Sequence, residues 1–386
     1  FPVFLTAFDQ DQRQWSEELQ LIGSALDKRL EYTLGAYFFD EKAASFDSSV
    51  SAGRPTTLRS ATVHNTAWAL YGQATYRPAF IEGAYITGGL RWSRDERQAT
   101  LDQTSVALNG TQTVRPQGRG DNNFSDYSPS VIVGYDVTRD VNAYAKWSRG
   151  YKTGGYNLRA SSLASFTKGY GPERLDSFEV GLKSSWLNNR LRANIAVFRA
   201  NYRDIQVNIQ SDPLNPAVTD IFNAGQARIQ GFELDLTAKP SRALTFTANY
   251  AYLDAGYRRI IDQVTGANIA ARFNFVEAPR HTLAVGAQWT LPETPLGVPG
   301  VDVDYYMQSR KFSSTSDVRY IVGDYGLLNA RVSLSDIPVG VGRWRLSAYG
   351  RNLTDKQYYI ANFSAGLPAA FFGDPRSYGL ELSFEY

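Results

Sequence analysis

The sequence predicts an all-β protein, and more narrowly an antiparallel β-barrel that spans a membrane. Apolar and polar residues alternate with a period of two along most of the chain, which is the pattern of β-strands. The polar positions include full charges in the middle of strands, so one face of each strand must be wet. No run of 18 apolar residues occurs, which excludes a transmembrane helix of ordinary length.

The composition of the 386 residues narrows the function classes. There are 24 tyrosines and 21 phenylalanines but no cysteine and one methionine. The absence of cysteine excludes disulfides, thiolate metal ligands and cysteine nucleophiles. The formal net charge is +2 with acidic and basic residues interspersed, so no basic stripe indicates nucleic acid as a partner.

The alternation is clear in the last stretch of the sequence, RSYGLELSFEY. One face of this strand carries Tyr378, Leu380, Leu382, Phe384 and Tyr386, and the other carries Gly379, Glu381, Ser383 and Glu385. We expect the first set to face lipid and Glu381 and Glu385 to face the lumen, because a charge at mid-membrane on the lipid face costs about 1–4 kcal/mol.

Strand length separates a membrane barrel from a soluble sandwich. Sandwich strands run about 5 or 6 residues, whereas stretches such as NTAWALYGQATYRP stay strand-like for about 10 or more, the length that crosses a bilayer. Aromatic residues also stand at the ends of apolar faces, where interfacial girdles belong. These residues are Tyr76, Trp186, Trp289, Trp344 and Tyr386.

About fifteen strands are expected, each from apolar residues at every second position, as with Trp68, Leu70 and Tyr76 in the third. The predicted strands are 11–24, 29–42, 60–77, 80–98, 124–137, 140–154, 173–187, 190–210, 219–238, 242–258, 278–291, 301–314, 322–335, 342–356 and 374–386. Mid-strand charges such as Lys146, Glu179 and Asp235 belong to the wet face.

The connections between these strands alternate in length. The short turns include ALDK, RPAF, VTRD, LNN and KPSR, and the long loops fall at 43–59, 99–123, 155–172, 259–277 and 357–373. Such alternation is typical of the periplasmic and extracellular ends of a bacterial barrel. The last strand follows a long loop, so its end is expected on the periplasmic side. An odd strand count indicates that strands are lacking at the N-terminal side, since such barrels have even numbers.

Neither histidine has a setting suited to catalysis or to a metal. His64 and His281 stand alone in HNT and RHT, without a neighbouring nucleophile or a second ligand. The opening FPVFLTAFDQDQ lacks the features of a signal peptide. From the isolation of the two histidines we expect that the protein is not an enzyme and has no metal site and no cofactor.

Several motifs together resemble the C-terminal barrel of TonB-dependent outer-membrane receptors of Gram-negative bacteria. They are WSRGYKTGGYN (147–157), ERLDSFEVGLKSSWLNNRLRANIAVFRANYRDIQV (173–207), GFELDLTAKPSRALTFTANYAYLDA (231–255), GRNLTDKQYY (350–359) and the terminal GDPRSYGLELSFEY. They follow the order that the family uses, and the match covers nearly the whole chain.

The resemblance implies a 22-stranded barrel around an N-terminal plug that carries the TonB box. Residues 1–386 would then form a single partial barrel domain starting near strand 8, with the plug outside this chain. The last strand resembles the signal read by the barrel assembly machinery, formed by Tyr378, Leu380, Leu382, Phe384 and Tyr386, although Tyr386 stands where Phe is more usual.

The same resemblance implies active import of a scarce solute, by default a ferric siderophore. The implied partners are the TonB-ExbB-ExbD complex acting through the plug, the barrel assembly machinery, outer-membrane lipid and lipopolysaccharide, and the small-molecule solute. A saccharide, cobalamin or an aromatic compound are alternative solutes, and a passive porin-type channel is the alternative mechanism.

Aromatic residues in the predicted loops are candidates for stacking on the solute. They are Tyr151, Tyr156, Phe166, Tyr170, Phe363, Phe371 and Phe372. A local structural role is the alternative for two motifs: Gly154 and Gly155 would supply positive φ in GYKTGGYN, and Asn352 and Asp355 would bond nearby backbone in RNLTDKQYY.

Overall fold

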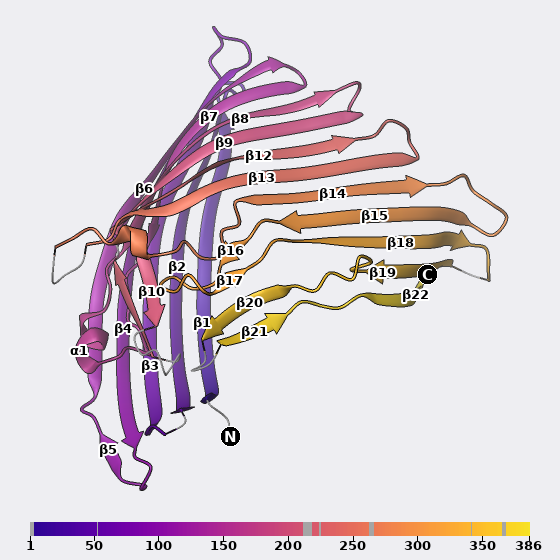
Figure 1. Ribbon diagram of the computed structural model, residues 1–386. Helices are drawn as coiled ribbons and strands as arrows, with labels where there is room; N and C mark the ends of the chain where they lie inside the picture. The colour runs from indigo at the N-terminus through magenta and orange to yellow at the C-terminus, as the bar shows by residue number, and fades with distance from the viewer. Residues whose placement is uncertain are drawn as a thin grey trace.

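The computed structural model describes residues 4–51, 53–210, 218–223, 225–261, 266–340, 342–364 and 368–386. Fifteen long strands follow one another in one antiparallel sheet (Figure 1). They are β1 (Phe4–Ala25), β2 (Leu30–Ser51), β3 (Thr56–Tyr76), β4 (Ala84–Val106), β6 (Gly118–Thr138), β7 (Val141–Lys152), β8 (Glu173–Trp186), β9 (Leu191–Arg203), β12 (Gln226–Ala238), β13 (Leu244–Arg259), β14 (His281–Thr290), β15 (Val298–Gln308), β18 (Tyr325–Ile337), β19 (Arg343–Arg351) and β22 (Ser377–Glu385).

The remaining elements are short and belong to the long loops. β5 (Gln112–Val114) extends the main sheet beside β4. Three separate hairpins are β10 (Gln206–Gln210) with β11 (Thr219–Asn223), β16 (Lys311–Phe312) with β17 (Ile321–Val322), and β20 (Tyr359–Ser364) with β21 (Pro368–Phe372). The helices of the described residues are α1 (Leu163–Lys168) and the 3₁₀ turn η1 (Ala270–Arg272). None of them is long and apolar enough to cross a membrane.

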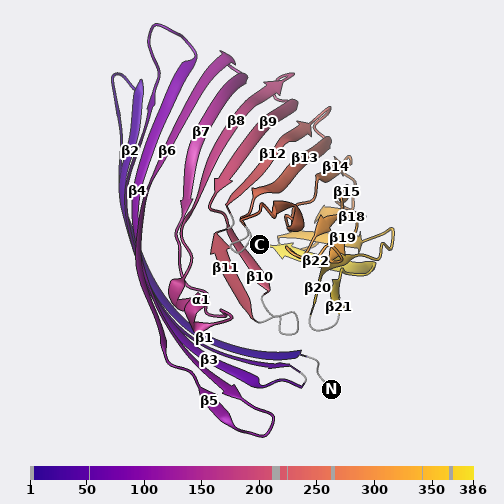
Figure 2. The same ribbon diagram turned by 60° about the vertical axis from the view of Figure 1, so that its left-hand side comes forward.

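The main sheet curls into an open arc. Figure 2 shows α1 and the β10–β11 hairpin lying inside that arc. The two faces of the wall can be assigned from packing, because Phe166 of α1 contacts Ala61 of β3 and Leu101 of β4 in one buried cluster. Their side of the sheet is the concave face, and the alternate residues of each strand form the convex face.

The predicted strands are confirmed in number, order and antiparallel pairing, with corrections to their bounds. The predicted long loop at 43–59 is wrong, because β2 and β3 run on as a paired ladder, with the pair Ser49 and Thr57 as its outermost rung. In the stretch AASFDSSVS one face carries Phe46 and Val50 and the other is polar, so the period of two persists but rests on two apolar residues.

Two predicted long strands are each divided by a break. The range 190–210 ends as β9 at Arg203, because Asp204 adopts a positive φ of 55°, and the chain resumes as β10 in a loop hairpin. The range 219–238 likewise divides into β11 and β12. The range 342–356 ends at Arg351, where Asn352 has φ 48°.

The convex face carries a continuous apolar band. Val180 faces Val197 across the β8–β9 ladder, and Val197 faces Phe232 across β9–β12. The prediction for the last strand is confirmed: Leu380 and Leu382 are 80% and 65% exposed. Glu381 lies on the opposite face, where Arg331 of β18 donates to it at 3.1 Å. Apolar side chains that are exposed in this way are suited to contact with lipid tails.

Aromatic residues bound this band at both ends. The girdle at the short turns contains Tyr76, Trp186, Trp289 and Trp344, as predicted. A second girdle lies on the loop side and was not predicted from the sequence. It contains Trp15, Phe38, Trp68, Trp92 and Trp147. The ring centroids of Phe38 and Trp68 are 4.2 Å apart. Eight positions separate Trp68 from Tyr76, which is about 27 Å along a strand and about 21 Å across a bilayer at a tilt of about 40°.

The two edges of the sheet remain open. In the described part of the chain β1 pairs only with β2, and β22 pairs only with β19. This confirms the prediction that residues 11–24 and 374–386 are not partners. A total of 22 strands stays a prediction.

Candidate functional site

The concave wall is lined by tyrosines that lie across glycines of the neighbouring strand. A Cβ built on Gly35 would lie 2.1 Å from Cζ of Tyr71, and one on Gly181 would lie 2.5 Å from Cζ of Tyr144. The same arrangement joins Tyr85 to Gly134 and Tyr349 to Gly379. The rings therefore lie flat along the wall and leave the space inside the arc open.

These tyrosines belong to a polar lining that also carries charges. The Tyr144 hydroxyl donates to Glu179 at 2.7 Å, and Lys183 lies 5.5 Å over the Tyr144 ring. Asp304 accepts from Asn329 at 2.7 Å, and Asp302, two positions away in β15, lies on the same face. The wet face predicted from alternation is thus the concave face.

The loop between β7 and β8 folds back onto this wall. Arg159 from the loop contacts Asp47 of β2 at 2.9 Å, and Arg59 of β3 contacts the same carboxylate at 2.8 Å. Asp47 is 5% exposed and Arg59 is 3% exposed. The Asp47–Arg59 pair within the wall is buried, whereas the Arg159 side chain is 40% exposed, so Arg159 ties the loop to a carboxylate that Arg59 already holds in place.

An apolar cluster holds the same loop. Phe166 of α1 is fully buried against Ala61, Ala99 and Leu101, and Tyr156 packs on its ring at 5.7 Å. Ser162 caps the helix by accepting from the Ser165 N–H at 3.1 Å. Phe166, predicted as a stacking residue for the solute, therefore packs the loop onto the wall and exposes no surface in this arrangement.

Tyr170 closes the base of this loop. Its backbone pairs with Gly155, and a Cβ on Gly154 would lie 2.2 Å from the Tyr170 carbonyl oxygen. Gly154 is required by this close approach, whereas a Cβ on Gly155 would meet only the Tyr170 hydroxyl, at 3.0 Å. The expectation of positive φ at Gly154 and Gly155 is wrong, since neither has one. Burial raises the pKa of the Tyr170 hydroxyl above its ordinary value, because the charged form would lose its hydration.

The β10–β11 hairpin joins the folded loop. Asn157 donates to the Thr219 carbonyl at 2.6 Å, and the Ser161 N–H donates to Asp220 at 3.2 Å. The hairpin itself packs through Val207 into a second buried cluster with Ile260 and Ala270. The loop 153–172 and this hairpin together form a cover over the loop end of the concave face.

Tyr151 borders a hollow beside this cover. The hollow has a volume of about 370 Å³ and is lined by Tyr37, Phe39, Arg91, Asp95 and Tyr151 among others. The guanidinium group of Arg91 lies 5.6 Å from the Tyr37 ring and 5.6 Å from the Tyr71 ring. A guanidinium group held between aromatic rings suits a flat anionic ligand.

The remaining predicted aromatic residues lie in the β20–β21 hairpin, on a different loop. Phe371 and Phe372 are 62% and 71% exposed, and Phe363 packs on Phe371 with centroids 5.3 Å apart. The structure thus places the seven predicted residues in two groups rather than one. Contact of Tyr151, Tyr156, Tyr170 and the hairpin group with a solute remains a prediction.

The RNLTDKQYY motif begins the last long loop. Asn352 is 4% exposed; its amide donates to the Lys356 carbonyl at 2.9 Å and its Oδ1 accepts from the Lys356 N–H at 2.9 Å. The predicted local role of Asn352 is confirmed. Asp355 instead forms an ion pair with Arg376 at 3.3 Å.

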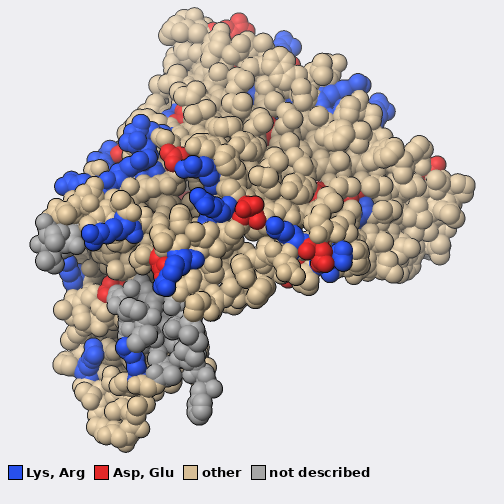
Figure 3. Space-filling view, in the orientation of Figure 1, with Lys and Arg blue, Asp and Glu red and all other residues tan. Residues whose placement is uncertain are grey.

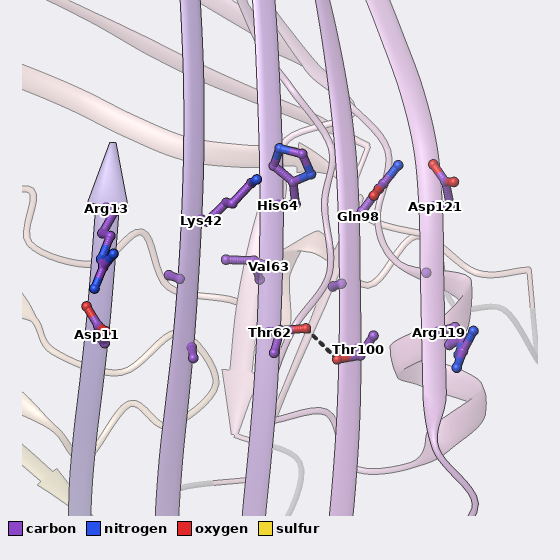
Figure 4. A pocket seen from close by; sticks show the side chains of 14 residues that line it. Asp11, Arg13, Lys42, Thr62, Val63, His64, Gln98, Thr100, Arg119 and Asp121 are labelled. Carbon is purple, nitrogen blue, oxygen red and sulfur yellow. Dashed lines mark hydrogen bonds between the residues drawn. The ribbon is translucent and has the colours of Figure 1, made fainter. Parts of the chain in front are cut away.

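Another hollow lies on the convex face, and Figure 4 shows the side chains that line it. It has a volume of about 810 Å³ and is lined by side chains of both signs, including Asp11, Arg13, Lys42, Arg119 and Asp121. His64 lies at its edge and contacts Asp40 at 2.7 Å. No three histidine, aspartate or glutamate side chains in the described segments converge as metal ligands.

Comparison with known proteins agrees with this architecture. The model of the family described as TonB dependent receptor-like, beta-barrel, matches residues 3–353. The Metal-pseudopaline receptor CntO of Pseudomonas aeruginosa is 27% identical over 67% of this chain and 33% of that receptor. The Ferric-pyoverdine M114 receptor PbuA of Pseudomonas sp. strain M114 is 24% identical over 67% of this chain and 29% of that receptor.

A solved structure shares the fold. The ferric yersiniabactin uptake receptor FyuA from Yersinia pestis superimposes with a TM-score of 0.81 at 18% identity, covering 99% of this chain and 55% of that one. The matched part of the two curated relatives is about a third of their length. Since the family model covers most of the sequence, the chain belongs to the TonB-dependent receptors, a family of outer-membrane transport receptors.

Proposed function

We propose that this chain forms the C-terminal wall of an energised outer-membrane importer whose solute is a ferric siderophore. The observation that carries the proposal is the open ladder of fifteen strands, whose outer strands β1 and β22 have no partner on their free sides within the described residues. Unpaired backbone groups in a membrane cost several kcal/mol each, so further strands must complete the wall. A complete small porin would instead have these two strands paired.

In the proposed mechanism the wall surrounds a plug that belongs to the same receptor outside this chain. TonB, energised by ExbB and ExbD, pulls on the plug and opens a path along the polar concave face. The barrel assembly machinery inserts the wall by reading the last strand, which places the C-terminus in the periplasm.

The choice of an iron chelate rests on two supports. The relatives named above carry names that refer to metal-pseudopaline and ferric-pyoverdine. The hollow containing Arg91, Tyr37 and Tyr151 combines a cation with aromatic rings, which suits the anionic and often aromatic ligands of a ferric chelate.

Growth of a deletion strain on defined iron sources tests the proposal. Complementation with the full-length gene should restore growth on one ferric siderophore in a strain with TonB and fail in a strain without it. Restored growth without TonB would indicate a passive channel. Growth rescue on a saccharide, cobalamin or an aromatic carbon source, with no iron phenotype, would replace the siderophore as solute.

A further inference from the structure

The main sheet divides between β6 and β7 on the loop side. The two strands pair as far as Ser130 and Ser148, and no rung between described residues joins them beyond that point. β6 continues beside β4 up to Gly118, whereas β7 continues beside β8 up to Lys152. Figure 2 shows the two strands parting there, with α1 beyond the loop end of β7. Residues 119–127 of β6 therefore form an edge inside the wall, which we call the β6 edge.

The backbone groups that point outward from this edge follow from one hydrogen bond. The Asp136 N–H donates to the Gly83 carbonyl oxygen at 2.8 Å. Residues of an antiparallel ladder alternate between hydrogen-bonded and non-bonded pairs, so even-numbered residues of β6 bond to β4 and odd-numbered ones turn their N–H and C=O groups away from it. No backbone hydrogen bond from a described residue reaches those outward groups in the β6 edge. They belong to Arg119, Asp121, Asn123, Ser125 and Tyr127.

The position of Pro129 agrees with this assignment. Pro129 is an odd-numbered residue without an N–H, and the β4–β6 ladder continues through its pairing with Leu90. Proline is tolerated in a strand where the position needs no donor toward the neighbour. The ladder from β6 to β7 ends next to this residue, at Ser130.

The β6 edge is open from the convex side of the wall. Four of its five odd-numbered residues are exposed by residue class, and the fifth, Tyr127, is 61% exposed. The loop 153–172 lies against the other face, where a Cβ built on Gly120 would be 2.2 Å from Cε1 of Tyr156. The loop thus covers the concave face of β6 and leaves the outward backbone groups of the edge unpaired.

An open edge of this length is uncommon in natural sheets. Nine residues span about 27 Å along a strand, and natural edges are usually protected by lysine, proline or a bulge. Residues 119–127 contain no lysine and no proline, and their register with β4 has no shift. A row of alternating N–H and C=O groups is matched by another extended polypeptide, which can satisfy all of them as one added strand.

A second copy of the receptor does not fit this edge. Two copies in one membrane are related by an axis along the membrane normal, so strands tilted by about 40° would cross at about 80° and could not pair. Antiparallel pairing of two β6 edges would need an axis in the membrane plane, which places one copy upside down. The occupant is therefore a segment of a different polypeptide.

The charges of the edge select among such segments. Figure 4 shows Arg119 and Asp121 together on β6, at the border of the hollow of about 810 Å³. Arg119 donates to Gln117 at 2.9 Å, and neither charged residue has an ion pair within the described part of the chain. Figure 3 shows isolated charges on a mostly uncharged surface at the loop ends of β4 and β5, in the lower left of the view. A basic residue opposite Asp121, followed two positions later by an acidic one opposite Arg119, would pair both charges.

We propose that the β6 edge binds an extended segment of another polypeptide outside the cell and adds it to the sheet as an antiparallel strand. The segment carries a basic residue and, two positions later, an acidic residue. The inference uses the membrane orientation in the proposed function, with the long loops outside the cell, but not the identity of the solute or the source of energy.

Synthetic peptides and the purified full-length receptor in detergent test the inference. The matching peptide has nine residues and capped ends, all threonine except Lys at the seventh position and Glu at the ninth. With its first residue opposite Tyr127, it places Lys opposite Asp121 and Glu opposite Arg119. A second peptide exchanges Lys and Glu. A third has the matching sequence with N-methyl groups at its third, fifth and seventh residues, whose N–H groups would face β6.

Two variants at Asn123 form a matched pair. Asn123→Pro removes an outward N–H and none that bonds to β4, so the wall should stay intact, as it does at Pro129. Asn123→Ala removes the side chain and keeps the N–H. Fluorescence anisotropy of labelled peptides measures binding, and hydrogen exchange of β3, which should be equal in both variants, confirms that the wall is folded.

We expect the receptor and Asn123→Ala to bind the matching peptide at least tenfold more tightly than Asn123→Pro does. The N-methylated peptide should also bind at least tenfold more weakly, because it lacks the donors. The peptide with exchanged charges should bind about threefold more weakly, the usual effect of exposed ion pairs. Arg119→Glu combined with Asp121→Lys should reverse that preference, and bound peptide should slow hydrogen exchange of the Ser125 amide.

Equal affinity for the N-methylated and matching peptides would overturn the inference, as would a lack of binding by every peptide. Equal loss of binding in both Asn123 variants would indicate a side-chain site and not an added strand. Receptor dimers that disappear in Asn123→Pro would assign the edge to a second copy and likewise overturn it. Solute import is measured separately, so peptide binding without TonB-dependent import contradicts only the proposed function.

Discussion

Gly35 and Gly181 show how single residues shape the concave wall. Each faces a tyrosine ring so closely that a Cβ would lie 2.1 Å or 2.5 Å from the ring. We expect Gly35→Val to displace Tyr71 and lower the free energy of unfolding by about 1–3 kcal/mol, the usual cost of overpacking. Urea unfolding of the full receptor in detergent measures this change.

Gly256→Ala provides the control, because no described atom lies within 4 Å of a Cβ built there. A neutral result for Gly35→Val would mean that the Tyr71 ring moves aside freely and has no fixed place on the wall.

The assignment of faces can be tested at Val197. This residue is 58% exposed on the convex face and lies opposite Val180. Val197→Arg should reduce stability by about 2–4 kcal/mol at mid-membrane. Asn194→Arg, on the concave face beside Asp235, should be tolerated. Refolding into lipid vesicles measures both, and the reverse ranking would show that the faces are exchanged.

At the scale of elements, strands were predictable from the sequence and loop structure was not. Within the membrane the face toward lipid must be apolar. Apolar residues at every second position, such as Phe178, Val180 and Leu182, therefore predict both the strand and the face that it turns toward lipid. Beyond the membrane both faces are polar or small, and in the continuation of β2 to Ser51 only Phe46 and Val50 mark the apolar face, a signal too sparse to extend the predicted strand.

The cover of the concave face depends on contacts between residues far apart in the sequence. Arg159 and Asp47 are 112 positions apart, and nothing in the local pattern of either residue indicates the partner. Phe166 was predicted as a stacking residue for the solute, and its burial could not be foreseen because it depends on small residues, Ala61 and Ala99, in distant strands.

The folded loop should detach when its ion pairs are removed. Asp47→Ala leaves the buried Arg59 unpaired, at a cost of about 3–5 kcal/mol to the wall, and frees the part-exposed Arg159 of the loop, at a cost of about 1 kcal/mol. Hydrogen exchange of residues 153–172 should accelerate while β8 and β9 stay protected. Asp27→Ala, in an exposed turn, is the control. Unchanged exchange in Asp47→Ala would assign the anchoring to the Phe166 cluster alone.

The last strand offers a test of assembly. Tyr386 is 99% exposed and ends the apolar face of β22. Tyr386→Asp should lower the amount of receptor in the outer membrane with no change in transcript, because the proposed assembly signal is altered. Glu385→Gln, on the other face, should insert normally. Equal surface levels of Tyr386→Asp and the wild type would contradict the proposed signal.

For the whole molecule, the open edges make a prediction about the complete receptor. Residues 1–386 contain no cysteine, so a pair introduced here has no competing cysteine within this part of the receptor. Cysteines at Leu346 and Leu382, which are partners across β19 and β22, should cross-link. Cysteines at Leu19 in β1 and Leu382 in β22 should not, because other strands are proposed to separate them. Efficient cross-linking of the second pair would indicate a closed smaller barrel.

The order of strands in the wall has a consequence for how such a protein can be built. Each long strand between β1 and β22 pairs with the long strands before and after it in the chain, so neighbours in sequence are neighbours in space. Every ladder then closes only one loop, and the entropy of closure rises slowly with loop length. Each new pair of strands can therefore join the edge of the growing sheet without waiting for later parts of the chain. The long loops can also change in length and sequence without altering the register between the strands.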